Sequence, residues 1–112
     1  MTVYFVTRHI GALQWACEHN AHYDVHLTHV DDLTLFKAKD MVIGTLPIQW
    51  VADLNAQGVH YMHLSMDIPA HLRGVELNAQ QLCDCHIRLE AFQVTRSKME
   101  VADNESRLHI YT

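Results

Sequence analysis

Two short apolar runs each pass through a polar turn into a segment of helical period, and this repeated design limits the possible folds more than any other feature of the chain. In the first, Val3–Val6 leads through Thr7–Gly11 into a helical pattern. In the second, Met41–Ile43 leads through Gly44–Pro47 into another. Strand, helix and returning strand form a βαβ unit with a right-handed crossover. The pattern predicts an α/β domain of three layers, with helices on both faces of a mostly parallel sheet.

The polarity of each run predicts its place in that sheet. Val3–Val6 and Met41–Ile43 are apolar throughout, as central strands buried on both faces are. His22–Val30 alternates polar and apolar residues, which is typical of an edge or half-exposed strand, and Val59–Met66 is a third apolar strand. We therefore expect a small Rossmann-like domain with the first two runs at its centre.

The last element of the fold is predicted to be a helix. Asn78 and Gln81 have the spacing of a capping box, and apolar residues at helical spacing continue over about Ala79–Phe92. The core pattern ends there, because the following stretch is polar and charged. We expect one domain over residues 1–95 and a C-terminal extension of open role over residues 96–112.

Charge and cysteine content exclude several classes of protein. The chain has 13 acidic and 8 basic residues, a net charge of −5, whereas binding to long nucleic acid depends on many Lys and Arg contacts to phosphate. Its three cysteines, Cys17, Cys83 and Cys85, lack the density of a disulfide framework, which favours a reducing compartment. No apolar run approaches the length of a membrane span. We expect a cytoplasmic protein that binds neither long nucleic acid nor membranes.

The two strand-to-helix turns are the first candidate site. Parallel neighbours end at the same edge of a sheet, so Thr7–Gly11 and Gly44–Pro47 should form one wall of a pocket there. Backbone N–H groups at helix starts and the guanidinium of Arg8 suit a phosphodiester. The alternative is that Thr7 and Thr45 are ordinary helix caps and that Arg8 pairs with a carboxylate.

The segment Arg73–Glu76 places opposite charges around Gly74 and is expected to be a shaped loop. Glu76 is the acidic residue expected nearest the pocket. The alternative is an ion pair between Arg73 and Glu76.

Ten histidines raise the question of a metal site. His60 with His63, and His26 with His29, are three residues apart, so on a strand the two members of each pair point to opposite faces. On a helix, the cysteines of Cys83–His86 also diverge, and no second cysteine pair completes a zinc site. Phosphate-binding signatures of the Gly-x-Gly-x-x-Gly and Walker types are absent from the sequence. We expect no metal and no cofactor.

Several motifs in order resemble a known family, the small Csx-type proteins of type III CRISPR loci that act as ring nucleases. The resemblance spans roughly residues 1–94. The motifs are Tyr4-Phe5-Val6-Thr7-Arg8-His9, Gly11-Ala12, Trp15-Ala16, Asp40-x-Val42-Ile43-Gly44-Thr45-Leu46-Pro47, Gly58-x-x-Tyr61-x-His63-Leu64, Pro69 and Arg73-Gly74-x-Glu76-Leu77.

The resemblance implies a CARF-like domain that forms a homodimer and holds cyclic tetra-adenylate (cA4) across its two-fold axis. The implied activity is metal-independent cleavage to linear di-adenylate with 2′,3′-cyclic phosphate ends, which switches off type III antiviral signalling. Two alternatives remain open. One is a protein that binds the ring without cutting it, as a sponge or sensor, and the other is an accessory subunit of a CRISPR effector.

Residue roles follow from the resemblance together with the chemistry of the turns. Arg8 and Arg73 are expected to hold the phosphate and stabilise its developing charge. His9 is expected to act as general acid or base, or else only to hydrogen-bond the ligand, and Glu76 to orient Arg73 or to take the 2′-proton. The residues expected to bind the ligand are Thr7, Gly11, Gly44, Thr45, Leu46, Pro47 and Gly74.

Overall fold

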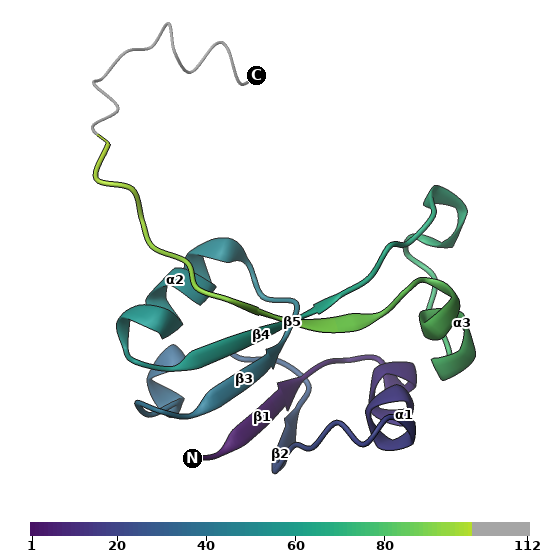
Figure 1. Ribbon diagram of the computed structural model, residues 1–112, viewed down its shortest axis with the longest axis horizontal. Coiled ribbons are helices and arrows are strands. Elements are labelled where there is room, and N and C mark those ends of the chain that lie inside the picture. Colours follow the sequence, from purple (N-terminus) through teal and green to yellow (C-terminus); the bar gives the residue numbers. More distant parts are fainter. Residues whose placement is uncertain (100–112) are drawn as a thin grey trace, which may run out of the picture.

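The computed structural model describes residues 1–99, which build a five-stranded sheet with helices on both faces (Figure 1). The strands lie in the order β2-β1-β3-β4-β5. Their bounds are β1 Val3–Val6, β2 Val25–Leu27, β3 Met41–Gly44, β4 His60–Ser65 and β5 Arg88–Phe92. The helices are α1 Ile10–Glu18, α2 Ile48–Ala56 and α3 Ala79–Asp84, with short 3₁₀ turns η1 Leu33–Leu35 and η2 Ala70–Leu72. Most of the predicted C-terminal extension, residues 100–112, lies outside the described residues.

The first four strands are parallel, and β5 pairs antiparallel with β4. The apolar runs β1 and β3 lie at the centre, where Phe5 and Val42 are fully buried. The alternating segment forms β2, an edge strand with two exposed residues and one half-buried residue. The predicted class, a Rossmann-like α/β domain with a mostly parallel sheet, is confirmed.

Side chains along the central strand β1 point alternately to the two faces of the sheet and pack into two separate cores. Phe5 packs in the core beneath α1 and α3, while the next residue, Val6, packs in the core beneath α2. Figure 1 shows α1 and α3 on one side of the sheet and α2 on the other. Burying side chains of this size contributes about 1.5–3 kcal/mol each. The two cores therefore hold the carboxyl ends of β1 and β3 in a rigid frame.

The edge strand β2 is shorter than the predicted His22–Val30. Asp24 receives the Val3 N–H on its carboxylate at 2.8 Å, and its own N–H donates to the Val3 carbonyl at 2.7 Å. The aspartate side chain thus replaces a ladder partner, and regular pairing begins one residue later.

The prediction of one helix over Ala79–Phe92 is wrong in its second half. The capping box of Asn78 and Gln81 is confirmed, but α3 ends at Asp84, and His86 takes a left-handed backbone with φ 58°. The chain then turns back as β5 and pairs with all but the first residue of β4. Pairing satisfies backbone groups along β4 that would otherwise stay open, and this tertiary gain outweighs the local helical period.

The direction in which successive strands are added to the sheet reverses between β1 and β3. From β1 the chain passes through α1 to β2 on one side, and from β3 it passes through α2 to β4 on the other. The connecting helices lie on opposite faces, so a crevice opens outside the carboxyl ends of β1 and β3. Both predicted turns leave the sheet at this point.

Candidate functional site

Two cavities of about 580 Å³ and 350 Å³ lie at the carboxyl edge of the sheet. Both are bordered by Val6, Thr7, His9 and Thr45, so they adjoin along the ridge that the ends of β1 and β3 form. The prediction that the two turns lie side by side and shape one pocket region is confirmed.

The larger cavity has an apolar wall and a polar rim. The segment between β4 and α3 supplies Met66, Ile68 and Leu72 to the wall, while His63 and Glu76 supply polar groups. An apolar wall with a few convergent polar groups is the usual lining of a small-molecule site.

The smaller cavity is more polar and lies on the side of α2. Its lining includes Arg8, His29 and Asp31 from the loops, and Trp50 from α2. His29 Nε2 lies 3.2 Å from a carboxylate oxygen of Asp31. The cavity thus combines a cation, an aromatic surface and a small hydrogen-bonded network.

Hydrogen bonds hold the turn after β1 in place. Thr7 is buried, and its Oγ1 accepts the N–H of His9 at 3.1 Å. Its carbonyl contacts Nε2 of His26 at 2.9 Å, and its N–H donates to the carbonyl of Leu27 at 2.9 Å. The alternative in which both threonines are helix caps is wrong, because the N-cap residues of α1 and α2 are His9 and Pro47.

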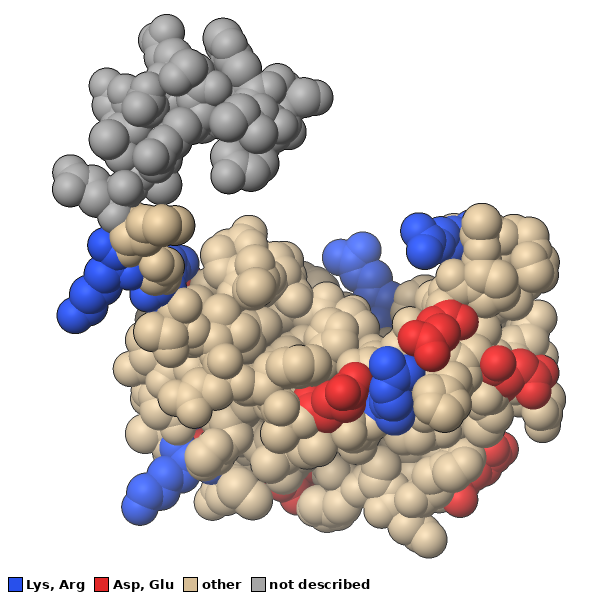
Figure 2. Space-filling view, turned by 45° about the horizontal axis from the view of Figure 1, so that its top comes forward, with Lys and Arg blue, Asp and Glu red and all other residues tan. Residues whose placement is uncertain are grey.

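Both arginines of the predicted site are exposed. Within residues 1–99, no carboxylate lies within ion-pair distance of Arg8 or Arg73. Nε of Arg73 donates instead to the carbonyl of Ile68, at 3.4 Å. The alternatives in which Arg8 pairs with a carboxylate and Arg73 pairs with Glu76 are therefore not found in the described part of the chain. Figure 2 shows basic side chains at the upper edge of this face and both basic and acidic ones lower down.

The structure brings most of the predicted site residues together. The larger cavity is lined by Thr7, His9, Thr45, Gly74 and Glu76, and the smaller one by Thr7, Arg8, His9, Thr45 and Leu46. Among the described residues, four predicted members line neither cavity: Gly11, Gly44, Pro47 and Arg73.

Close packing explains two of these exceptions. A Cβ on Gly11 would lie 2.1 Å from the carbonyl oxygen of Leu77, and one on Gly44 would lie 3.1 Å from that of Val6. Both glycines let backbone segments approach at the border of the site. Their predicted contact with a ligand stays a prediction.

The chain matches a family described as "Putative CRISPR-associated protein (Cas_VVA1548)" over residues 4–95. The chain belongs to this family. The match includes both cavities and the whole fold except the first residue of β1, so the CRISPR association implied by the sequence motifs is confirmed. No curated protein and no solved structure matches this CRISPR-associated chain significantly.

Two further properties concern ions and membranes. In the described part of this CRISPR-associated chain, no three His, Cys, Asp or Glu side chains gather as metal ligands would. Among the same residues, the helices are too short or too polar to cross a bilayer.

One polar pair in this CRISPR-associated fold was missed by reasoning from the sequence. Tyr61 and His63 lie two apart on β4 and therefore share a face of the sheet. The Tyr61 hydroxyl lies 2.8 Å from Nδ1 of His63, and burial raises the pKa of Tyr61, which keeps it neutral. The spacing of two on a strand was the available signal. Both residues stand in the motif Gly58-x-x-Tyr61-x-His63-Leu64, but reasoning from the sequence gave neither of them a role in the site.

Proposed function

We propose that this CRISPR-associated protein is a ring nuclease that binds cA4 at the β1/β3 crevice and cleaves it to linear di-adenylate. Such an activity switches off type III antiviral signalling. The observation that supports it most is the polar ridge of Thr7, His9 and Thr45 between an apolar cavity and a cavity lined by an arginine.

The two cavities suit the two parts of a nucleotide. The apolar wall of Met66, Ile68 and Leu72 offers contact area for an adenine ring. The ridge offers hydroxyl and backbone donors, and Arg8 offers a planar cation for phosphate oxygens. One protomer thus provides the chemistry to hold one base and one adjoining phosphate.

A homodimer matches the symmetry of the ligand. A two-fold dimer places two copies of the crevice around one ring, and its four arginines, Arg8 and Arg73 of each subunit, match the four phosphates. The starts of α1 and α2 border this edge, where Ile10 and Ile48 are 65% and 69% exposed. A second copy, or the ligand itself, would remove these apolar side chains from water.

The reaction can proceed on the substrate's own nucleophile. The ribose 2′-hydroxyl attacks the adjacent 3′-phosphate in line, so the protein supplies geometry, proton transfer and charge stabilisation. Arg8 stabilises the charge on the phosphate, and His9 lies at the border of both cavities, within the region where that phosphate would sit.

A second candidate is a protein that binds the ring without cutting it. The position of Arg73 favours it, because this expected phosphate ligand lines neither cavity among the described residues. Product analysis after incubation with cyclic tri-, tetra- and hexa-adenylate separates the two functions. Linear di-adenylate from cA4 supports the nuclease, whereas a stable complex with intact ring supports the binding protein.

A further inference from the structure

The hydrogen bonds of Tyr61 determine which nitrogen of His63 carries a proton. The Tyr61 hydroxyl donates to the carbonyl of Gly44 at 2.8 Å and accepts the N–H of Leu46 at 3.0 Å. Nδ1 of His63 is its third partner, at 2.8 Å. The carbonyl belongs to the last residue of β3 and the N–H to the turn that follows, so this network links β4 to the ridge of the site.

A phenol has a single hydrogen to donate. The carbonyl of Gly44 can only accept, so that hydrogen is used there, and Nδ1 of His63 must then be the donor of its own hydrogen bond. The opposite assignment would leave two acceptors, the Tyr61 oxygen and the Gly44 carbonyl oxygen, in contact at 2.8 Å without a hydrogen between them. Neutral His63 therefore carries its proton on Nδ1, and its Nε2 has a free lone pair.

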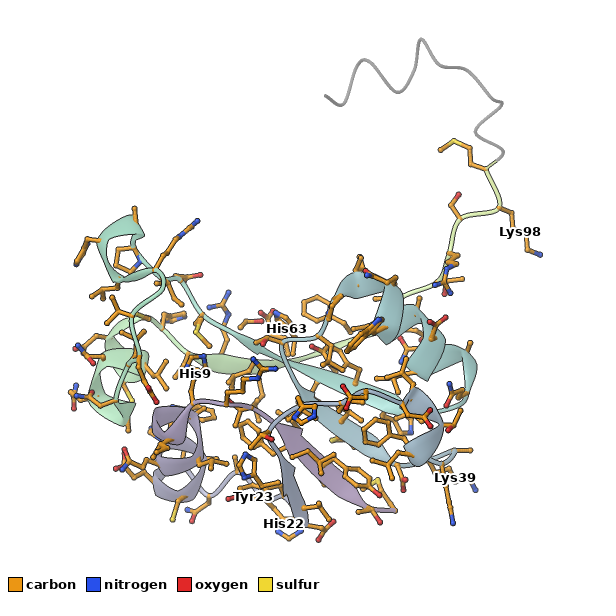
Figure 3. All side chains as sticks on the ribbon, turned by 180° about the vertical axis from the view of Figure 1, so that it is seen from behind. His9, His22, Tyr23, Lys39, His63 and Lys98 are labelled. Atoms are coloured by element: carbon orange, nitrogen blue, oxygen red, sulfur yellow. The ribbon has the colours of Figure 1, made fainter. Side chains whose placement is uncertain are left out.

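That free nitrogen belongs to a residue of the larger cavity. His63 is half-buried and lines the cavity, and within residues 1–99 its Nε2 has no hydrogen-bond partner. Its ring is held by aromatic contacts, with centroids 5.9 Å from Tyr61 and 5.9 Å from Phe92 at 74°. Figure 3 shows His63 and His9, which borders the same cavity from the turn after β1.

An ionised carboxylate lies next to His63. Glu90 of β5 stands directly opposite it in the sheet. Hydrogen bonding from Ser65 and the nearby guanidinium of Arg88 hold the pKa of Glu90 below its ordinary value, so its carboxylate stays ionised. This carboxylate therefore faces the ring on which the proposed step places a positive charge.

We propose that His63 is the general base of the ring cleavage, with Tyr61 as the positioning residue that fixes its tautomer. This inference rests on the proposed nuclease function and adds a residue outside the set predicted from the sequence.

The proposed step balances in atoms and protons. Nε2 of His63 takes the 2′-hydroxyl proton, the 2′-oxygen bonds to phosphorus, and the bond from phosphorus to the 5′-oxygen breaks. Imidazolium His9 gives its proton to that leaving oxygen. The products are a 2′,3′-cyclic phosphate and a 5′-hydroxyl, and proton exchange with water restores both imidazoles.

The first test compares single-turnover cleavage of cA4 by the wild type and His63→Asn in EDTA. Asparagine keeps an amide donor near the position of Nδ1 and lacks the base at Nε2. The expected result is a rate lowered by about 10²–10⁴-fold, the usual contribution of a general base, with unchanged affinity for cA4. In His63→Gly, added imidazole should restore part of the rate, which a purely structural role of His63 would not allow.

The pH profile provides an independent readout. A general base and a general acid together give the wild type a bell-shaped profile, in which the base sets the fall at low pH and the acid sets the fall at high pH. The other titratable or charged groups around His63 are Tyr61, Glu90, Arg88 and, across the cavity, Glu76. Replacing His63 with Asn should remove the fall at low pH and keep the fall at high pH.

The tautomer can be tested without any cleavage. Nitrogen and carbon chemical shifts of the His63 ring in the free protein should report a proton on Nδ1, and this preference should weaken in Tyr61→Phe. A proton on Nε2 in the wild type would overturn the structural step. If the wild type cleaves cA4 and His63→Asn cleaves it at the same rate, the role of His63 is overturned and the nuclease function stands. A wild type that leaves the ring intact would refute the nuclease function and the base with it.

Discussion

Replacing Gly11 with alanine should destabilise the protein, although alanine is the better helix former. A Cβ at this position would lie 2.1 Å from the carbonyl oxygen of Leu77 and 3.0 Å from the Cα of Asn78. These are backbone atoms, and the capping box of α3 and the burial of Leu77 hold them in place. The start of α1 would have to move by roughly an ångström to restore ordinary contact distances.

The magnitude follows from two opposing effects. Overpacking of a well-filled site costs about 1–3 kcal/mol. Alanine recovers at most about 1 kcal/mol of helix propensity over glycine, and less than that in the first turn. The close atoms are backbone atoms that cannot rotate away, so the cost lies in the upper part of that range, about 2–3 kcal/mol. Subtracting about 1 kcal/mol of helix propensity leaves an expected net loss of about 1–2 kcal/mol in the free energy of unfolding.

Urea unfolding of Gly11→Ala, wild type and the exposed control Gln14→Ala provides the assay. The control lies on the same helix and should stay within about 0.5 kcal/mol of the wild type, as surface substitutions usually do. Because α1 begins beside His9, the movement should also weaken cA4 binding by Gly11→Ala. A variant as stable as the wild type would show that α1 does not approach Leu77 as closely as described.

Three further changes have defined outcomes. Replacing Arg8 with alanine should lower single-turnover cleavage of cA4 by at least about 10²-fold, measured against wild type at saturating protein, as for other groups that stabilise transition-state charge. The N–H groups of Lys37 and Thr2 hold the pKa of Asp40 below its ordinary value, so its contribution to stability is present above the ordinary carboxyl pKa and is lost as the pH falls through the lowered one. Asp40→Asn should therefore flatten the fall in urea midpoint between pH 6 and pH 3, two values on either side of that range. Deleting residues 96–112, which lie beyond the family match, should leave the cleavage rate unchanged, and a large loss would place part of the site in that extension.

The central part of the fold was predictable because one physical cause dominates it. Apolar side chains at every position of Val3–Val6 and Met41–Ile43 can be buried only between two layers, and these runs are the central strands β1 and β3. Once they are neighbours, their turns must meet, which is why Thr7 and Thr45 border both cavities.

The end of the domain was not predictable from local pattern. Leu82 and Leu89 are seven residues apart, which fits one face of a helix, yet Leu89 belongs to β5. The hydrogen bonds that β5 forms with the edge of β4 join segments distant in the sequence, so they do not change the spacing of apolar residues within either segment. The left-handed backbone of His86 that permits the reversal is equally hidden, since histidine is not a residue that this conformation requires.

The same contrast holds for the site residues. The residues of the turns follow directly from the strand ends, whereas Arg73 sits in a loop, donates to the carbonyl of Ile68 and is absent from the lining of both cavities. The tautomer of His63 depends on three hydrogen bonds of Tyr61 to two different elements, and only the folded geometry brings these together.

The most direct test of the central claim is turnover of radiolabelled cA4 by a small amount of protein in EDTA. The account predicts many rings cleaved per dimer, with linear di-adenylate that carries a 2′,3′-cyclic phosphate as the product. Retention of the label in the intact ring, bound one ring per dimer, would contradict it and identify a binding protein instead. Cleavage that stops completely in EDTA would contradict the metal-independent mechanism.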